Sequence, residues 1–210
     1  RSFITDYDID GFKLDFIDSF VLRPETEHST GGGRDMDSLA EAVDRLLTDV
    51  TAALRALKPE VLIEFRQAYI GPVMRKYGNM LRAGDVPNDF HGNRLGTVDV
   101  RLLAAETAVH ADMVMWHPAD SVESAAMQLV HTLFAVPQVS VRLADIPEAH
   151  RRMVAFYLKF WREQRDVLLD GTFLPEEPGA LYPVVQAVTK TRHLAACYSG
   201  RLVDLKGDMP

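Results

Sequence analysis

The spacing of apolar residues changes its period repeatedly along the chain, and these changes define the predicted elements. Short alternating or continuous apolar runs predict strands at 12–17, 61–65, 80–83, 112–116 and 138–143. Between them, apolar residues three and four positions apart predict helices at 37–57, 72–77, 95–107, 121–135 and 147–169. Strands that alternate with helices in this way favour βαβ units, in which the strands are parallel.

Residues suited to helix starts support several of these boundaries. Ser38 or Asp37 can cap the helix at 37–57, because an acidic residue follows near the third helical position. Ser121 is a suitable cap for the helix at 121–135, and Pro147 suits the first turn of the helix at 147–169.

After Gly171 the pattern changes to alternating apolar positions at 182–189 and 193–199, which predict antiparallel strands. We therefore expect two domains, 1–171 and 172–210. A barrel of eight βα units needs roughly 250 residues, so five strands within the first domain predict only part of a barrel. The alternative is a doubly wound open sheet, but no glycine-rich phosphate loop follows any predicted strand. The chain starts without methionine, and we expect it to be a piece of a longer protein.

Composition excludes several classes of function. The chain has 210 residues, 47% of them hydrophobic, and a formal charge of −7, which argues against a nucleic-acid partner. No apolar run reaches the roughly 18 residues of a spanning helix, so we expect no membrane partner. The one cysteine, Cys197, excludes an internal disulfide and fits a reducing compartment such as the cytoplasm. No pair of histidines has the spacing of a metal site, and we predict neither a metal nor a cofactor.

The stretch Asp10-Gly11-Phe12-Lys13-Leu14-Asp15-Phe16 carries the most specific chemistry. On a strand, Lys13 and Asp15 point from the same face. Two opposite charges on a buried face are costly unless they pair tightly or serve a site. A carboxylate that a neighbouring ammonium keeps ionised is a candidate nucleophile or base. The alternative is a structural Lys–Asp pair.

Carboxylates recur where the predicted strands end, at the edge where parallel barrels keep their active sites. Asp15 follows the first strand and Asp85 follows the third. Glycoside hydrolysis requires two carboxylates at one pocket: one attacks or stabilises the anomeric carbon, and the other protonates the leaving oxygen. Asp15 would be the nucleophile and Asp85 the acid. Trp116, after the fourth strand, is either a platform for a sugar ring or a core aromatic.

Phe12-Lys13-Leu14-Asp15, Ile63-Glu64-Phe65-Arg66 and Arg82-Ala83-Gly84-Asp85 resemble, in order and spacing, motifs of glycoside hydrolase family 36, the melibiase-like α-galactosidases. The resemblance covers about residues 5–170. It implies strands four to eight of a (β/α)8 TIM barrel, followed by the start of a β-sandwich. It also implies that Asp15 is the nucleophile, that Lys13 contacts sugar hydroxyls, and that Asp85 is the acid/base.

The sequence departs from that family at two positions near the sugar. Arg66 stands where the family has cysteine, and Arg82 stands where it has tryptophan. An arginine ahead of the acid/base also occurs in family 27, and the segment 66–71 resembles one of the family 31 α-glucosidases. The three families form one clan with a retaining mechanism. Arg66 and Arg82 are then candidate substrate-binding residues, and two arginines in a pocket would suit an anionic sugar.

The resemblance therefore predicts a retaining exo-α-glycosidase of α-galactosidase type, acting on an oligosaccharide or another α-glycoside. The alternatives are a family 31-like α-glucosidase or α-xylosidase, a transglycosidase, and a non-catalytic carbohydrate-binding relative. A barrel without its first three strands would have open edges, which favour pairing between chains. We therefore expect that the chain can form a homo-oligomer. We also expect the isolated fragment to be inactive.

Overall fold

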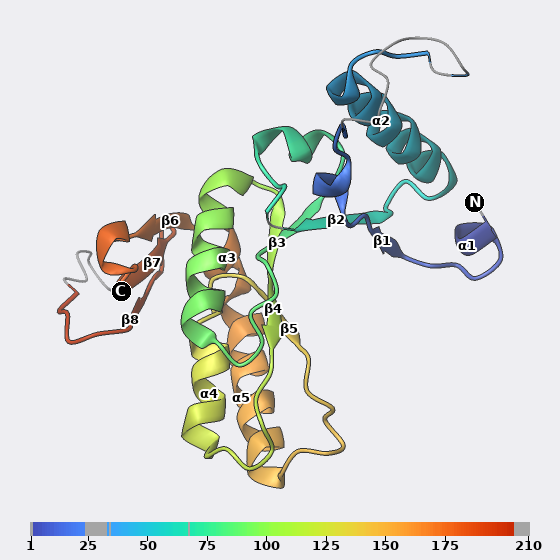
Figure 1. Cartoon of the computed structure of the whole chain (residues 1–210). Helices are drawn as coiled ribbons and strands as arrows, with labels where there is room; N and C mark the ends of the chain where they lie inside the picture. The colour runs from blue at the N-terminus through green and yellow to red at the C-terminus, as the bar shows by residue number, and fades with distance from the viewer. Residues whose placement is uncertain (1, 24–32, 34, 67, 204–210) are drawn as a thin grey trace. The chain divides into compact units, whose positions relative to one another are not determined.

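The computed structural model describes residues 2–23, 33, 35–66 and 68–203 (Figure 1). The chain divides into two compact units, Arg1–Leu81 and Arg82–Pro210, and each is described by itself. This division lies within the third strand, away from the predicted boundary at 171/172, where the second sheet begins.

Five strands share one sheet and follow one another in chain order: β1 (Gly11–Lys13), β2 (Leu62–Arg66), β3 (Met80–Arg82), β4 (Ala108–Val114) and β5 (Val136–Val139). β1 pairs in parallel with β2, and β4 pairs in parallel with β5. The predicted parallel arrangement is therefore confirmed for these pairs. A strand order without reversal is that of a (β/α) barrel, whereas a doubly wound sheet reverses at a switch point.

The first unit also holds α1 (Ser2–Thr5), η1 (Ile17–Ser19), α2 (Leu39–Leu57) and η2 (Pro72–Lys76). The Ser38 hydroxyl accepts a hydrogen bond from the Glu41 amide, so Ser38 and not Asp37, the other predicted candidate, caps α2. On β2, Ile63 and Phe65 are completely buried, while Leu62 remains 43% exposed. The alternate positions of β2 thus separate a core face from the face that carries Glu64 and Arg66.

Two glycines allow close packing around β2. A Cβ on Gly11 would lie 2.7 Å from Leu62 Cβ, and a Cβ on Gly78 would lie 2.6 Å from a ring carbon of Phe65. Only glycine permits backbone to approach its neighbours this closely. β1 can therefore pair with β2 at the place where the candidate site begins.

In the second unit, α3 (Phe90–Ala104), α4 (Val122–Val130) and α5 (Glu148–Arg165) lie alongside β4 and β5 (Figure 1). α3 begins five residues before the predicted start because Asp89 caps it, accepting a hydrogen bond from the Gly92 amide at 2.9 Å. Ser121 caps α4 as predicted. Apolar side chains of β4, α4 and α5 form a buried core that includes Ala111, Val114, Leu129 and Val154.

A three-stranded antiparallel sheet follows, made of β6 (Thr172–Pro175), β7 (Val184–Val188) and β8 (His193–Cys197), with η4 (Pro178–Ala180) between β6 and β7. The predicted antiparallel pair is confirmed as β7–β8, and β6 is an additional strand. The π-helical turn η3 (Asp166–Asp170) joins α5 to this sheet. Val185 and Ala187 share a core with Val98 of α3 and Leu168 of η3, so the sheet packs on the helical layer of its own unit.

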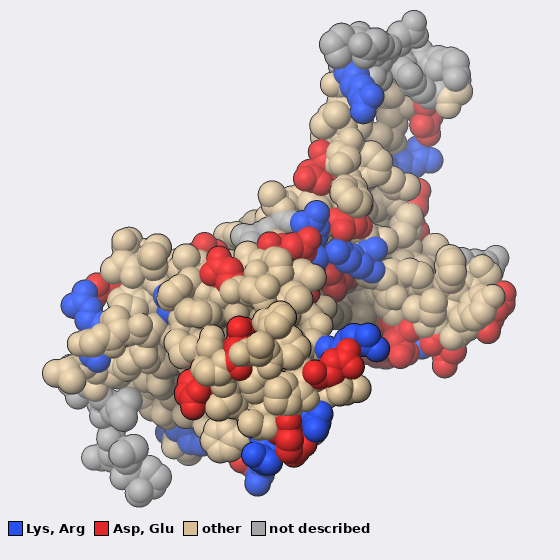
Figure 2. Space-filling model, turned by 60° about the horizontal axis from the view of Figure 1, so that its bottom comes forward, with Lys and Arg blue, Asp and Glu red and all other residues tan. Residues whose placement is uncertain are grey.

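Acidic and basic side chains are interspersed over the face shown in Figure 2. Over the ranges that the structure describes, no helix combines the length and apolar character needed to cross a membrane.

Candidate active site

Four donors hold the Asp15 carboxylate just beyond β1. Oδ1 accepts from Arg66 Nε at 2.8 Å, from the Phe16 amide at 2.8 Å and from the Tyr69 hydroxyl at 3.1 Å. Oδ2 forms an ion pair with Lys13 Nζ at 3.0 Å. Lys13 and Asp15 thus point the same way, as the strand period predicts. Among the described residues, Oδ1 therefore accepts three hydrogen bonds, whereas Oδ2 has one partner, Lys13.

The backbone turns sharply to make this arrangement. β1 ends at Lys13 and not at residue 17, and Phe16 adopts a left-handed conformation with φ of 58°. The parallel ladder continues one step further, because the Leu14 amide donates to the Glu64 carbonyl at 3.1 Å. The Tyr69 hydroxyl lies 2.9 Å from the Leu14 carbonyl, so its one proton is shared between that carbonyl and Asp15. Asp15 therefore sits where the strand becomes a loop.

These contacts fix the charge of Asp15. The hydrogen bond from Arg66 lowers the pKa of the Asp15 carboxyl well below its usual range, and Lys13, the Phe16 amide and Tyr69 add to this effect against the cost of burial. Burial and the neighbouring Asp15 raise the pKa of the Tyr69 phenol to about 12, so it remains a donor at neutral pH. Asp15 is a carboxylate over the whole physiological range, as a nucleophile requires.

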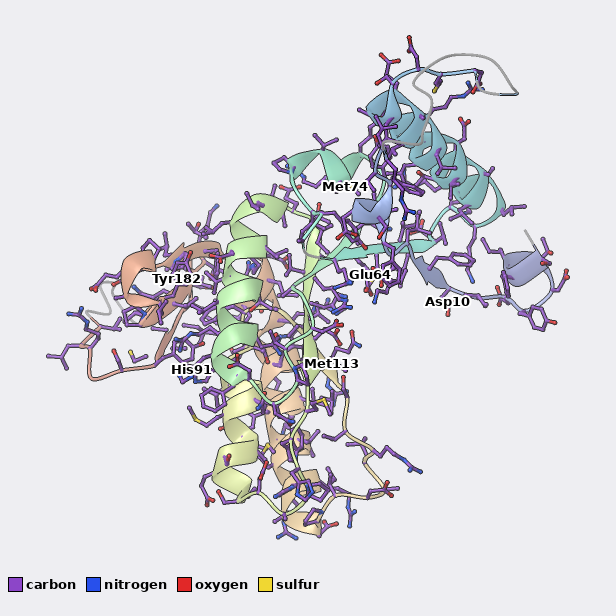
Figure 3. All side chains as sticks on the ribbon, in the orientation of Figure 1. Asp10, Glu64, Met74, His91, Met113 and Tyr182 are labelled. Carbon is purple, nitrogen blue, oxygen red and sulfur yellow. The ribbon has the colours of Figure 1, made fainter. Side chains whose placement is uncertain are left out.

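A hollow of about 240 Å³ opens at Lys13, the ion-pair partner of Asp15, and is lined by Gly11, Phe12, Lys13, Leu62, Glu64 and Met80. Lys13 and Glu64 are register partners on β1 and β2, and Glu64 is labelled in Figure 3. The hollow thus lies on the polar face of β1 and β2, on which Lys13, Glu64 and Arg66 are carried. Hydrogen-bonding groups around a small open hollow are suited to a polar ligand.

In the second unit, Arg82 joins two carboxylates. Both of its terminal nitrogens lie 2.9 Å from Asp85 Oδ1, and one of them also donates to Asp112 Oδ2. The Asp85 side chain is 56% exposed, whereas the side chains of Arg82 and Asp112 are 4% and 8% exposed. Asp85 is thus an accessible carboxylate oriented by a buried guanidinium.

Trp116 is a core residue in this structure. It is 4% exposed, packs with the apolar side chains of β4, α4 and α5, and donates its indole N–H to His150 Nδ1 at 3.0 Å. Of the two roles that the sequence left open, this geometry supports the core aromatic and gives sugar stacking no support. The physical reason is that a ring surrounded by protein offers no face to a ligand.

The sequence reasoning missed Tyr69 and Asp112. Tyr69 lies in the segment that resembles family 31, but its position there did not indicate contact with Asp15. The sequence pattern predicts Asp112 only as the start of a strand, whereas β4 begins at Ala108. The presence of His110 and Asp112 within an apolar strand could have indicated a polar contact there, because charged residues are rarely buried without partners.

No group of three or more histidine, cysteine or acidic side chains suited to a metal ion occurs among the described residues. The donor set at Asp15 is cationic, which also disfavours a cation there.

Comparison with solved structures identifies a similar fold. The galactosidase domain of alpha-galactosidase-sucrose kinase, AgaSK, superposes with a TM-score of 0.59 at 14% sequence identity. The match covers 74% of this chain and 22% of that chain. No protein-family model and no curated protein matches the sequence. At this identity the likeness shows the fold, a partial (β/α) barrel with an adjoining antiparallel sheet, and the chemistry must be argued from the side chains.

Proposed function

We propose that this chain carries the two catalytic carboxylates of a retaining exo-α-glycosidase of α-galactosidase type. Residues 1–171 would supply strands four to eight of a glycoside hydrolase family 36-like barrel, and residues 172–210 would begin its β-sandwich. The observation that supports this proposal most strongly is the environment of Asp15. This carboxylate lies at the end of a strand, with Arg66 Nε at 2.8 Å and Lys13 Nζ at 3.0 Å. The fold shared with a galactosidase domain adds support.

In the first step, Asp15 Oδ2 forms a bond to the anomeric carbon as the glycosidic bond breaks. The leaving oxygen takes the proton of Asp85, which becomes a carboxylate. Oδ2 is the attacking atom because Oδ1 already accepts three hydrogen bonds. Lys13 would contact a sugar hydroxyl; its pairing with Asp15 Oδ2 and the 39% exposure of its side chain are compatible with that role.

In the second step, the Asp85 carboxylate removes a proton from water, and the resulting hydroxide attacks the anomeric carbon. The ester bond to Asp15 breaks and the carboxylate is regenerated, so the configuration at the anomeric carbon is retained. The mechanism requires both carboxylates to reach the same glycosidic bond.

The contacts of Arg66 and Arg82 indicate which class of sugar the site would accept. Arg66 pairs with Asp15, and Arg82 pairs with Asp85 and Asp112. Each guanidinium charge is already compensated, so neither is available to an anionic group on the sugar. We therefore favour a neutral sugar over a uronic or sulfonated one.

The test compares three variants with the unmodified protein on aryl α-galactosides, each as the full-length protein and not as an isolated fragment. We expect Asp15→Asn to lower kcat by on the order of 10³-fold or more, and Asp85→Asn by about 10²–10⁴-fold. Asp49→Asn is the matched control, because Asp49 forms an exposed pair with Arg45 at 3.7 Å on α2. Wild-type turnover by Asp15→Asn would refute the assignment. Azide should restore turnover to Asp15→Gly and yield the inverted glycosyl azide.

A second candidate is a family 31-like α-glucosidase or α-xylosidase. Tyr69 and Arg66 both contact Asp15, and both belong to the segment that resembles family 31. Comparing α-galactosides, α-glucosides and α-xylosides at equal concentration separates the two. Product analysis with an added sugar acceptor identifies a transglycosidase, and calorimetric sugar binding without turnover identifies a carbohydrate-binding relative.

A further inference from the structure

The buried guanidinium of Arg82 has two carboxylate partners in very different surroundings. Asp112, on β4, is nearly enclosed, and its neighbour Met113 is labelled in Figure 3. Asp85 is mostly open to solvent. His110, two positions before Asp112 on the same strand, is also buried. Only Asp85 of these two carboxylates is accessible to a substrate.

An acid/base residue must be neutral for part of each catalytic cycle. When Asp85 carries a proton, its ion pair with Arg82 loses its negative charge. The Arg82 side chain is 4% exposed, and a guanidinium buried to this extent cannot remain without a counterion except at a cost of several kcal/mol. Asp112 is the group that can supply that counterion, because it contacts the same terminal nitrogen as Asp85.

We propose that Asp112 is a positioning residue for the acid/base Asp85, acting through Arg82. It keeps the guanidinium neutralised and in place, so that Asp85 can gain and lose a proton without leaving a buried cation unpaired. This inference rests on the proposed glycosidase function. It adds a residue that never touches the substrate.

The informative variant is Asp112→Asn in the full chain, which keeps the side-chain shape and removes the charge. Arg82 then has Asp85 as its remaining carboxylate partner in this trio and stabilises that carboxylate. We expect the basic limb of the kcat/KM pH profile to move by about one unit to lower pH. Turnover of a glycoside with a poor leaving group should fall by about tenfold or more. A 2,4-dinitrophenyl glycoside, whose leaving group needs no proton, should react within about twofold of wild type in the glycosylation step.

Asp166→Asn is the matched control, because Asp166 forms an Arg–Asp pair with Arg192 and both side chains are exposed. We expect no change in leaving-group dependence for that variant. If Asp112→Asn does not fold, Arg82→Met and Arg82→Met/Asp112→Asn replace it. Because Asp112 acts through Arg82, these two variants should have the same pH profile.

Three results would overturn the inference. The first is a wild-type pH profile and leaving-group dependence in Asp112→Asn. The second is an equal loss on both substrates, which indicates a purely structural role. The third is a different profile in the two Arg82→Met variants. In each case wild type is active and Asp85→Asn is impaired. A full-length wild-type protein that hydrolyses no α-glycoside is a separate outcome, which refutes the proposed function and this inference together.

Discussion

Arg66 donates its Nε–H to Asp15 across 2.8 Å, and both side chains are 23% exposed. Arg66 is therefore a partner of the nucleophile candidate. A guanidinium at this distance stabilises the carboxylate form and fixes one of its oxygens. The Arg66 guanidinium thus both holds Asp15 and keeps it charged.

Arg66→Met should raise the pKa of the Asp15 carboxyl, because the hydrogen bond from Arg66 is the largest cause of its depression. Lys13, the Phe16 amide and Tyr69 remain, so we expect a value still below the ordinary one of about 3.9. Carbon-13 NMR of the carboxyl groups during an acid titration measures this shift. Arg45→Met, which removes the exposed partner of Asp49, should leave the Asp15 titration unchanged. A titration of Asp15 that is identical in Arg66→Met and wild type would contradict the argument.

Tyr69→Phe should destabilise the first unit by about 0.5–1.5 kcal/mol, because it removes a hydroxyl bound to Leu14 and Asp15. Urea unfolding followed by circular dichroism measures the change. Tyr7→Phe is the control: Tyr7 is 74% exposed, and its substitution should change stability by less than about 0.5 kcal/mol. Equal effects of the two substitutions would show that the Tyr69 contacts contribute nothing.

Local sequence patterns predicted much of the fold but only part of the candidate site. Ser38 and Ser121 cap helices at the predicted places, because capping depends on residues three positions apart. The alternation of Lys13 and Asp15 likewise gave their shared face. Tyr69 and Asp112 meet their partners across 54 and 30 positions of chain, and no local period encodes such distances. β1 was predicted too long because the chain turns at Phe16, which is left-handed and donates its amide to Asp15, against the strand preference of the aromatic side chain.

Ser38→Ala tests the strongest local prediction. The Ser38 hydroxyl accepts the Glu41 amide at 3.3 Å, and its loss leaves a donor of the first helical turn without that partner. We expect a cost of about 1 kcal/mol in the free energy of unfolding, measured by urea denaturation. Thr48→Ala, at an exposed position within α2, should change stability by less than about 0.5 kcal/mol. A Ser38→Ala protein as stable as Thr48→Ala would refute the capping role.

The engaged arginines predict a preference among sugars. Because Arg66 and Arg82 already pair with carboxylates, a uronic or sulfonated α-glycoside should have no advantage over the neutral one. We expect a kcat/KM for the neutral glycoside at least about tenfold higher, because Lys13, the other cation at Asp15, is also paired with it at 3.0 Å, and an anionic group would have to break one of these pairs. Initial rates on matched aryl glycosides measure the ratio. Faster hydrolysis of the acidic sugars would show that an arginine leaves its carboxylate to bind substrate.

The depressed pKa of Asp15 also predicts how stability depends on pH. In the unfolded chain this carboxyl titrates near its ordinary value of about 3.9, and in the folded protein it titrates lower. The unfolded state therefore binds the proton first as the pH falls, so the stabilisation by Asp15 is complete above about pH 5 and is lost progressively below about pH 4.

The Asp15→Asn variant tests this pH dependence, because it removes the contribution of the carboxylate. We expect the variant to be less stable than wild type at pH 7, with a difference that narrows steadily as the pH is lowered. Urea unfolding at a series of pH values from neutral to acid gives the two curves, with Asp49→Asn as the exposed control whose difference from wild type stays small throughout. A gap between wild type and Asp15→Asn that is constant over the series would mean that the ion pairs of Asp15 do not stabilise the folded state.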